Sequence, residues 1–381
     1  MTDTVEPFHL QIEAAALDDL KLRLQRTRWP ERETVTDWRQ GAPLAAVQAL
    51  CAYWRQDYDW RKCERKLNAA GQFRTQIDGL DIHFLHKRSP HPDALPLILT
   101  HGWPGSVVEF LEVIGPLSDP AAHGGDPADA FHVVVPSLPG FGFSGKPAAT
   151  GWGVERIAAA WATLMRRLGY PRFVAQGGDW GSMVTQCLAH DSPADECLAV
   201  HINMATTFPS AADMTDLTEA EKSSLAGMQF YNDHDSGYSK QQGTRPQTLG
   251  YGLVDSPSGQ AAWIYEKFYA WTDHAGTPET ALSRDAMLDN ITLYWLTATA
   301  ASSARLYWES FQNFKTPEIT RPLGVSIFPK EIFRPSRRWA ERRYKNIVYW
   351  HELNQGGHFA AFEQPAAFVE EVRKCFRGFR S

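Results

Sequence analysis

Short apolar runs alternate with helical patterns over the middle and the end of the chain. LPLILT (95–100) has few polar positions, which is typical of a strand buried on both faces. Residues 152–168 instead repeat apolar side chains every three or four positions, as one face of a helix does. The other expected strands are FHVVVP (131–136), RFVAQ (172–176), CLAVHINM (197–204), GVSIF (324–328) and IVYWHEL (347–353). This alternation predicts an α/β fold with a mainly parallel central sheet and right-handed crossovers.

Two parts of the chain break the alternation. Residues 1–90 open with the helical pattern AAALDDLKLRLQRTRWP and continue with a tryptophan-rich stretch. Because such large rings need a partner surface, this helical and meander segment is expected to pack on the core and the cap. Residues 206–318 carry aromatic, mostly helical patterns, which predict a cap over the carboxyl ends of the strands, where open α/β sheets bind ligands. The expected core then comprises residues 91–205 and 319–381.

Composition excludes several classes of protein. The 381 residues carry a formal net charge of −6 with scattered lysines and arginines, which argues against a nucleic-acid-binding surface. The five cysteines are far apart and form no C-x-x-C pair, as in proteins of a reducing compartment. The N-terminus lacks a signal-peptide pattern, and no apolar run approaches the ~20 residues of a membrane span. A soluble, cytoplasmic protein is therefore expected.

The stretch AQGGDWGSMV (175–184) predicts a sharp turn between a strand and a helix. Turns of this kind usually display a serine nucleophile, but here Asp179 occupies that position. The alternative is an acidic helix N-cap, because a carboxylate there accepts backbone N–H bonds and suits the helix dipole. An ordinary cap does not need the three close glycines, Gly177, Gly178 and Gly181. We therefore interpret Asp179 as the nucleophile.

A carboxylate nucleophile restricts the substrate. An aspartate with a reference pKa of ~3.9 is already ionised near neutral pH, so it needs no base for attack. Attack on an ordinary ester would give an energy-rich anhydride, whereas attack on a saturated carbon that bears a leaving group gives a stable alkyl ester. An epoxide or an alkyl halide is therefore the expected substrate.

Hydrolysis of such an ester requires a base and stabilisation of an oxyanion. His358 follows the last predicted strand, where the histidine of an α/β-hydrolase triad falls in chain order; an ordinary loop histidine is the alternative. Glu331, directly after strand 324–328, is the expected orienting acid, with an exposed loop glutamate as the alternative. The backbone N–H groups of Trp103, in THGWPGS, and of Trp180 are expected to form the oxyanion hole.

Taken together, these segments resemble the epoxide hydrolases of the α/β-hydrolase superfamily, specifically the microsomal type with its N-terminal segment. GGDWGS is also shared with haloalkane dehalogenases, whereas the cap stretch combined with RLYWES is much more specific. Membrane-bound relatives carry an N-terminal anchor; this chain starts directly at the soluble segment, so membrane attachment is not expected. The matching segments are LKLRLQRTRWP, HGWPGS, GGDWGS, SGYSKQQGTRPQTLGYGLVDSPSGQAAWIYEKF, SSARLYWES, FPKE and GGHFAAFEQP.

The resemblance implies that Tyr238 and Tyr307 are the two cap tyrosines that hydrogen-bond the epoxide oxygen. An opening epoxide develops alkoxide charge, which a phenol can stabilise and protonate, whereas a departing halide needs no proton. Packing within the cap is the alternative for both side chains.

The sequence thus predicts an epoxide hydrolase that forms a vicinal diol from a hydrophobic epoxide and water. Asp179 forms a covalent alkyl-enzyme ester, which water activated by His358 hydrolyses. No metal is expected, because the histidines lack ligand spacing, and no dinucleotide, because Lys146-Pro147 follows GFGFSG (140–145) where a phosphate-binding helix would begin. A haloalkane dehalogenase with the same nucleophile and a non-catalytic binding protein are the alternatives. A homo-oligomer is left open.

Overall fold

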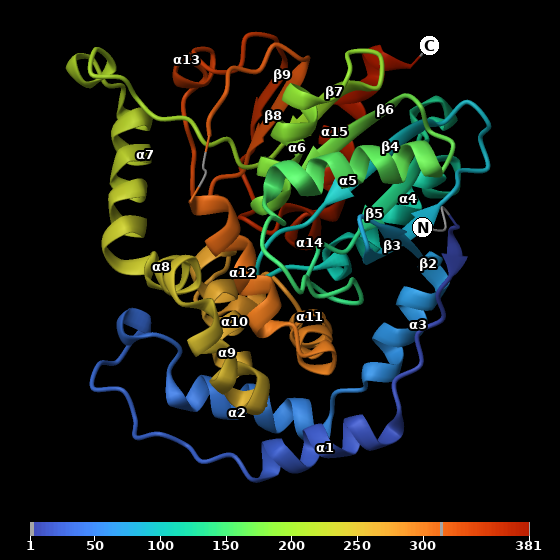
Figure 1. The fold of residues 1–381 in the computed structure, drawn as a ribbon. Coiled ribbons are helices and arrows are strands. Elements are labelled where there is room, and N and C mark those ends of the chain that lie inside the picture. The colour runs from blue at the N-terminus through green and yellow to red at the C-terminus, as the bar shows by residue number, and fades with distance from the viewer. Residues whose placement is uncertain (1–3, 313–314, 381) are drawn as a thin grey trace.

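The computed structural model describes residues 4–312 and 315–380, and in these it contains a nine-stranded sheet with the order β1-β2-β3-β5-β4-β6-β7-β8-β9 (Figure 1). From β5 to β9 every neighbouring pair of strands is parallel. The predicted α/β fold with a mainly parallel sheet is confirmed. The parallel strands are β4 Leu95–Thr100, β5 Phe131–Pro136, β6 Phe173–Gly177, β7 Cys197–Ile202, β8 Leu323–Ile327 and β9 Ile347–Glu352.

Three antiparallel strands extend the sheet on one side, and they were not predicted from the sequence. They are β1 (Glu6–Pro7), β2 (Gln72–Ile77) and β3 (Leu80–Lys87). A two-residue turn joins β2 to β3, and both of its residues, Asp78 and Gly79, have positive φ angles of 50° and 78°. An Asp-Gly pair is favoured in such hairpin turns because their geometry requires positive φ at both positions.

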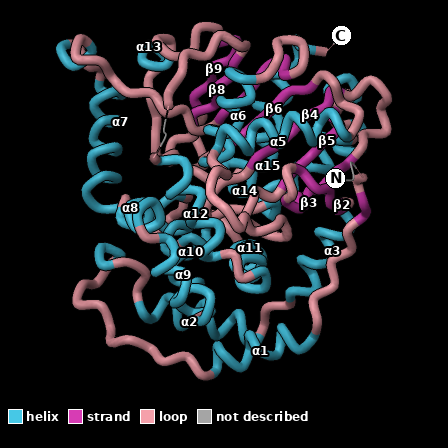
Figure 2. The backbone as a smooth tube through the Cα atoms, in the orientation of Figure 1, coloured by secondary structure: helices cyan, strands magenta, loops and turns pink. Residues whose placement is uncertain are grey.

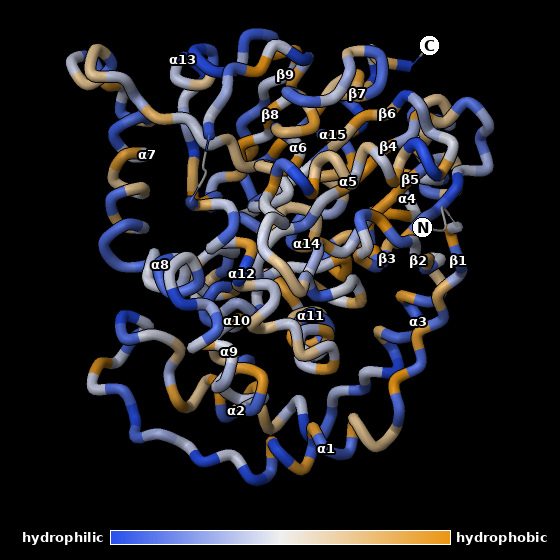
Figure 3. The backbone as a smooth tube through the Cα atoms, in the orientation of Figure 1, coloured by the Kyte–Doolittle hydropathy of each residue, from blue (hydrophilic) through white to orange (hydrophobic). Residues whose placement is uncertain are grey.

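Helices cover both faces of the parallel strands. α5 packs beside α6 in front of the sheet in Figure 1, and α15 packs beside α4 behind it. Figure 3 shows hydrophobic segments on the central strands and hydrophilic ones on the outer loops. Large rings such as Phe131, Trp161 and Phe173 are fully buried between these layers. The bounds are α4 Leu111–Ser118, α5 Val154–Arg167, α6 Trp180–Asp191, α14 Ala360–Glu363 and α15 Pro365–Phe376.

A helical insertion separates β7 from β8 and lies over one end of the sheet (Figure 2). A π-helical turn, Tyr231–Asp235, joins its first two helices. The boundaries of the cap at residues 206 and 318 stay predictions. Among the described residues, none of the helices has both the length and the apolar character needed to cross a bilayer. The cap helices are α7 Glu219–Phe230, α8 Gly237–Thr244, α9 Pro246–Asp255, α10 Pro257–Trp271, α11 Arg284–Thr297 and α12 Ala300–Phe311.

The first three helices pack against the outer side of this insertion. The Trp38 ring stacks on Tyr269 of α10, with centroids 3.9 Å apart and planes within 4° of parallel. The Tyr58 hydroxyl donates to Asp289 of α11 at 2.6 Å. The N-terminal segment therefore holds the cap from outside. Its helices are α1 Ala14–Gln25, α2 Leu44–Gln56 and α3 Trp60–Ala70.

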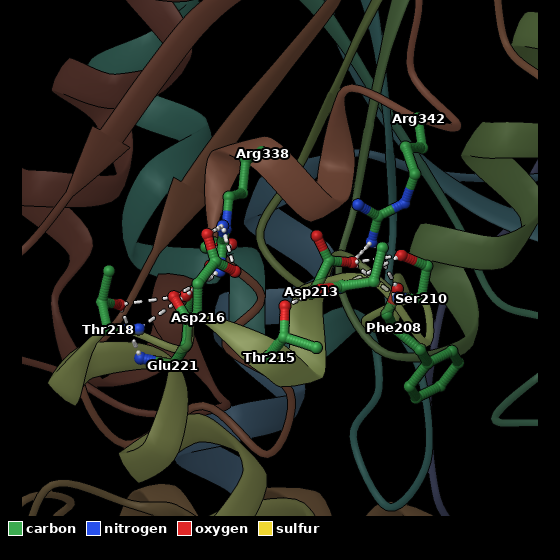
Figure 4. A network of polar contacts seen from close by, with 11 residues as sticks. Phe208, Ser210, Asp213, Thr215, Asp216, Thr218, Glu221, Arg338 and Arg342 are labelled. Carbon is green, nitrogen blue, oxygen red and sulfur yellow. Dashed lines mark hydrogen bonds and ion pairs between the residues drawn. The ribbon is translucent and has the colours of Figure 1, made fainter.

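A charged network attaches the start of α7 to the short helix α13 (Arg337–Ala340) of the core (Figure 4). The Arg338 guanidinium donates two hydrogen bonds to Glu221, at 2.6 and 2.7 Å, and another to Asp216 at 3.1 Å. Arg342 pairs with Asp213 at 2.6 Å. The hydrogen bonds from Arg338 lower the pKa of Glu221 to about 2, so this anchor is charged at neutral pH.

Candidate active site

Asp179 lies in a sharp turn between β6 and α6, with a φ of 49° and a ψ of −128°. The surrounding glycines are needed because the backbone is crowded: a Cβ atom on Gly177 would collide with the Gly181 carbonyl, and one on Gly181 with that of Thr100. The Asp179 side chain makes no capping hydrogen bond to α6. The turn therefore presents the carboxylate to the space above the sheet, as a nucleophile elbow does, and not to its own helix.

The turn after β4 supplies a backbone donor to this carboxylate. The Trp103 N–H donates to Asp179 Oδ1 at 2.8 Å. The other predicted donor is the backbone N–H of Trp180, the first residue of α6. In the described part of the chain it makes no hydrogen bond to the Asp179 carboxylate. A single amide therefore fixes one oxygen of Asp179 and leaves the second oxygen for other partners.

His358 bridges Asp179 and Glu331. Its Nδ1 lies 2.7 Å from Glu331 Oε1, and its Nε2 lies 3.4 Å from Asp179 Oδ2. Burial by itself lowers the pKa of His358, but the negative charges of Glu331 and Asp179 outweigh burial and hold the pKa well above its usual value. The imidazole is therefore a cation while both carboxylates are ionised.

Tyr238 of α8 and Tyr307 of α12 come from the cap and line the same cavity as Asp179. Both are buried, with 5% and 2% of their surface exposed, and their ring centroids are 5.8 Å apart. The Tyr307 hydroxyl has no hydrogen-bond partner among residues 4–312 and 315–380. Burial, with the charge of Asp179 as a further cause, holds the pKa of both phenols well above the usual value. Both side chains are therefore protonated and able to donate.

The tyrosines and Asp179 border a cavity of about 260 Å³. Most of its other wall is apolar or aromatic, which suits a hydrophobic ligand with one polar group near the tyrosines. The residues of that wall include Trp180, Met183, Met204, Phe208, Phe311, Ile332 and Phe333.

A second, polar cavity of about 20 Å³ lies on the other side of Asp179, against His358. This space is enough for one water molecule, which needs roughly 10–15 Å³. The Thr100 hydroxyl and the Gln176 amide oxygen are buried there without a partner in the described residues, so a water molecule would find polar contacts. Glu109 also lines the cavity, and burial raises its pKa to about 8.

Two of these cavity residues were not predicted from the sequence. Glu109 lies three residues after Ser106, and both side chains form a capping box, so its sequence signal is that of a helix start. Tyr231 lines the larger cavity seven residues before Tyr238, a spacing that places two side chains on one face of a helix. Neither signal identifies a site residue without the fold.

Comparisons with known proteins agree with this geometry. Residues 5–110 match the family described as "Epoxide hydrolase N terminus", and residues 96–243 match the family described as "alpha/beta hydrolase fold". A protein of Stigmatella aurantiaca named "Putative epoxide hydrolase" is 60% identical over 99% of this chain and 86% of its own length. Epoxide hydrolase 1 of Sus scrofa is 33% identical over 98% of this chain and 88% of its own length.

Solved structures give the same result. The juvenile hormone epoxide hydrolase of Bombyx mori superposes with a TM-score of 0.90 and 30% identity, covering 99% of this chain and 95% of the other. The epoxide hydrolase of Aspergillus niger superposes with a TM-score of 0.89 and 33% identity, covering 98% and 96%. The similarity thus includes the N-terminal segment and the cap as well as the sheet.

Proposed function

The chain belongs to the epoxide hydrolase family of α/β hydrolases, and from this premise we propose that it converts a hydrophobic epoxide to a vicinal diol in two covalent steps. The observation that carries the proposal is the pair of protonated phenols, Tyr238 and Tyr307, which share one cavity with the Asp179 carboxylate. A departing halide gains nothing from a proton, whereas an opening epoxide leaves an alkoxide that needs one. The aromatic wall favours an aryl or other hydrophobic epoxide.

In the first step, Asp179 Oδ2 attacks an epoxide carbon. The new C–O bond makes an alkyl ester, the ring C–O bond breaks, and its electron pair stays on the epoxide oxygen. Tyr238 and Tyr307 donate hydrogen bonds to that oxygen, and one of them transfers its proton. The Trp103 amide, bonded to Oδ1, orients the carboxylate so that Oδ2 is the attacking atom.

The same step prepares His358 for the second. The ester carries no charge, so one of the two carboxylates that raise the pKa of His358 no longer does so. The imidazolium then loses its proton more readily, and the phenolate left by the first step takes up a proton. Neutral His358, still oriented by Glu331, can next accept a proton from water.

In the second step, water attacks the carbonyl carbon of the Asp179 ester. The polar cavity of about 20 Å³ beside His358 supports this assignment, because it holds space for one water next to both groups. The oxyanion formed on Oδ1 is stabilised by the Trp103 amide, and we assign the Trp180 amide as the second donor in this intermediate. Collapse breaks the bond between the carbonyl carbon and the alkyl oxygen. That oxygen takes the remaining proton of the added water, which completes the diol and leaves Asp179 as a carboxylate beside protonated His358.

Mass spectrometry of a His358→Gln variant tests the proposal. Incubated with styrene oxide, the variant is expected to accumulate an adduct of the epoxide's mass on the peptide that contains Asp179, because the base for the second step is absent. The matched control is His351→Gln, which changes a half-exposed histidine that also pairs with a carboxylate, Glu371, outside the cavity. This control should turn over without accumulation.

Two results would contradict the mechanism. One is an adduct on a different peptide of the His358→Gln variant. The other is the absence of any adduct in that variant while the wild-type enzyme makes diol from the same epoxide. Release of halide from haloalkanes without diol formation from epoxides would instead favour the dehalogenase alternative.

A further inference from the structure

A third tyrosine contacts one of the two cap tyrosines, Tyr238. The Tyr231 hydroxyl lies 3.0 Å from that of Tyr238, in the π-helical turn between α7 and α8. Tyr231 also lines the larger cavity, and its ring packs edge-on against that of Phe333, with ring centroids 5.5 Å apart. Single π-helical turns inside α-helices often occur at functional sites. Here the turn places a phenol directly beside a proposed proton donor.

The direction of this hydrogen bond decides whether Tyr238 can act. A phenol can donate one hydrogen bond and accept others. If Tyr238 donates to Tyr231, its proton points away from the substrate. If Tyr231 donates to Tyr238, the Tyr238 proton is free for the epoxide oxygen. The Tyr307 hydroxyl has no hydrogen-bond partner in the described residues, so its proton is free for the epoxide oxygen.

The ring of Tyr238 is itself held firmly. Trp103 stacks on it with centroids 5.0 Å apart and planes within 10° of parallel. The buried ammonium of Lys267 lies 4.5 Å from its ring centroid and is fixed by Asp235 at 2.6 Å. The ring of Tyr238 is thus fixed, whereas the O–H bonds of Tyr238 and Tyr231 can still rotate.

We propose that Tyr231 is a positioning residue for ring opening: it donates to Tyr238, and Tyr238 donates to the epoxide oxygen. This inference rests on the proposed two-step mechanism. Hydrogen bonds in such a chain polarise one another, so the bond to the epoxide is stronger than one from an isolated phenol. When Tyr238 gives its proton to the alkoxide, the O–H of Tyr231 stabilises the Tyr238 phenolate.

The chain also provides a route for the returning proton. Tyr231 can pass its own proton to the Tyr238 phenolate, which moves the negative charge to the Tyr231 oxygen. Tyr231 is partly exposed, whereas Tyr238 and Tyr307 are buried. Water can therefore give a proton to the Tyr231 oxygen, and the hydroxide that this leaves is neutralised by the proton that His358 releases. The catalytic groups that touch the substrate remain Tyr238 and Tyr307.

Single-turnover kinetics of Tyr231→Phe test the inference. The substitution keeps the ring against Phe333 and removes the hydroxyl. With styrene oxide in rapid-quench mass spectrometry, formation of the Asp179 adduct should slow by roughly 3- to 10-fold, the factor expected for one hydrogen bond. Breakdown of the adduct should slow by a smaller factor than its formation, because only the return of the proton to Tyr238 then depends on Tyr231. The control is Tyr251→Phe, a cap tyrosine that is 73% exposed and should change neither rate.

A double-mutant cycle separates positioning from direct contact. In a Tyr238→Phe background, removing the Tyr231 hydroxyl should have no further effect on adduct formation, because its acceptor is already absent. An unchanged rate in the single variant overturns the inference, and so does an equal loss in both backgrounds, which would mean that Tyr231 acts without Tyr238. If the wild-type enzyme forms no adduct on Asp179, the two-step mechanism itself fails, a result distinct from the other two.

Discussion

Glu331 and His358 form a buried pair in which Glu331 Oε1 lies 2.7 Å from Nδ1 of the imidazole. The contact fixes which nitrogen faces the acid, so Nε2 faces Asp179. The second oxygen of Glu331 is buried and has no hydrogen-bond partner in the described chain. Oε1 also accepts the Ile332 N–H at 2.6 Å, which holds the carboxylate in place beside the histidine, as in the arrangement that orients a catalytic base.

Replacing Glu331 by glutamine should slow breakdown of the alkyl-enzyme more than its formation. A neutral amide keeps the size of the side chain but neither fixes the tautomer nor stabilises the imidazolium. The expected loss in the second step is on the order of 10²- to 10⁴-fold. Rapid-quench mass spectrometry would show the adduct accumulating. Glu318→Gln, a surface carboxylate paired with Lys345, is the control, and equal losses in both steps would count against this role.

Tyr307→Phe should separate stability from activity. Burying a hydroxyl without a partner destabilises the fold, so its removal should leave the free energy of unfolding unchanged or raise it by about 1 kcal/mol. Loss of one donor to the developing alkoxide should slow adduct formation by roughly 10²- to 10³-fold. Thermal unfolding and single-turnover rates measure the two effects. A less stable variant with normal ring opening would assign Tyr307 to packing.

Glu109 should make stability depend on pH. Burial raises its pKa from the ordinary 4.5 to about 8, so the folded protein keeps a proton that the unfolded chain releases. The resulting stability is fully present below pH 4.5 and is lost as the pH rises through the folded pKa. The side chain of Glu109→Gln stays neutral at every pH. The difference in unfolding temperature between this variant and the wild type should therefore increase in favour of the variant from pH 5 to pH 8.

The exposed neighbour Glu112 provides the control for that comparison. Glu112→Gln should follow the wild-type dependence across the same range. Glu363, whose pKa burial raises to about 7, contributes with the same sign, but it is present in all three proteins and drops out of the differences. Parallel curves for wild type and Glu109→Gln would show that Glu109 is ionised in the fold.

The network of Figure 4 should hold the first cap helix in place. Arg338→Met removes both hydrogen bonds from Arg338 to Glu221. The Glu221 side chain, only 2% exposed, is then left without its cation. Hydrogen exchange at the start of α7 should become faster. Arg337→Met, which removes an exposed helix pair with Glu341, should leave exchange there unchanged. Equal exchange in both variants would show that other contacts hold α7.

The strands that could be predicted are those whose burial is nearly continuous, because they give short apolar runs in the sequence. Strands β4 and β5 are buried along most of their length, and their bounds match the predicted runs at 95–100 and 131–136. Strand β2 mixes buried and partly exposed positions without a strict alternation, and β3 is buried only in its middle, so their runs are less distinct. The Asp78-Gly79 turn was the available signal for this hairpin.

The same distinction applies to the site. Asp179, Glu331 and His358 were inferred from their order in the chain and from the chemistry that each supplies, and the structure brings all three into contact. Tyr231 and Glu109 were not inferred. Their proposed roles depend on one hydrogen bond and one enclosed cavity, which arise from packing between segments and leave no periodic trace in the sequence.

The contacts of the N-terminal helices with the cap affect how a substrate enters. Stacking of Trp38 on Tyr269 and the Tyr58–Asp289 hydrogen bond attach the cap to the N-terminal segment. A hinged opening of the whole cap would have to break these two contacts. Phe208, which is 52% exposed, and Phe333 line the larger cavity, so the passage expected for epoxides runs past these two rings. Engineering the enzyme for bulkier epoxides would start at this passage, leaving the catalytic residues unchanged.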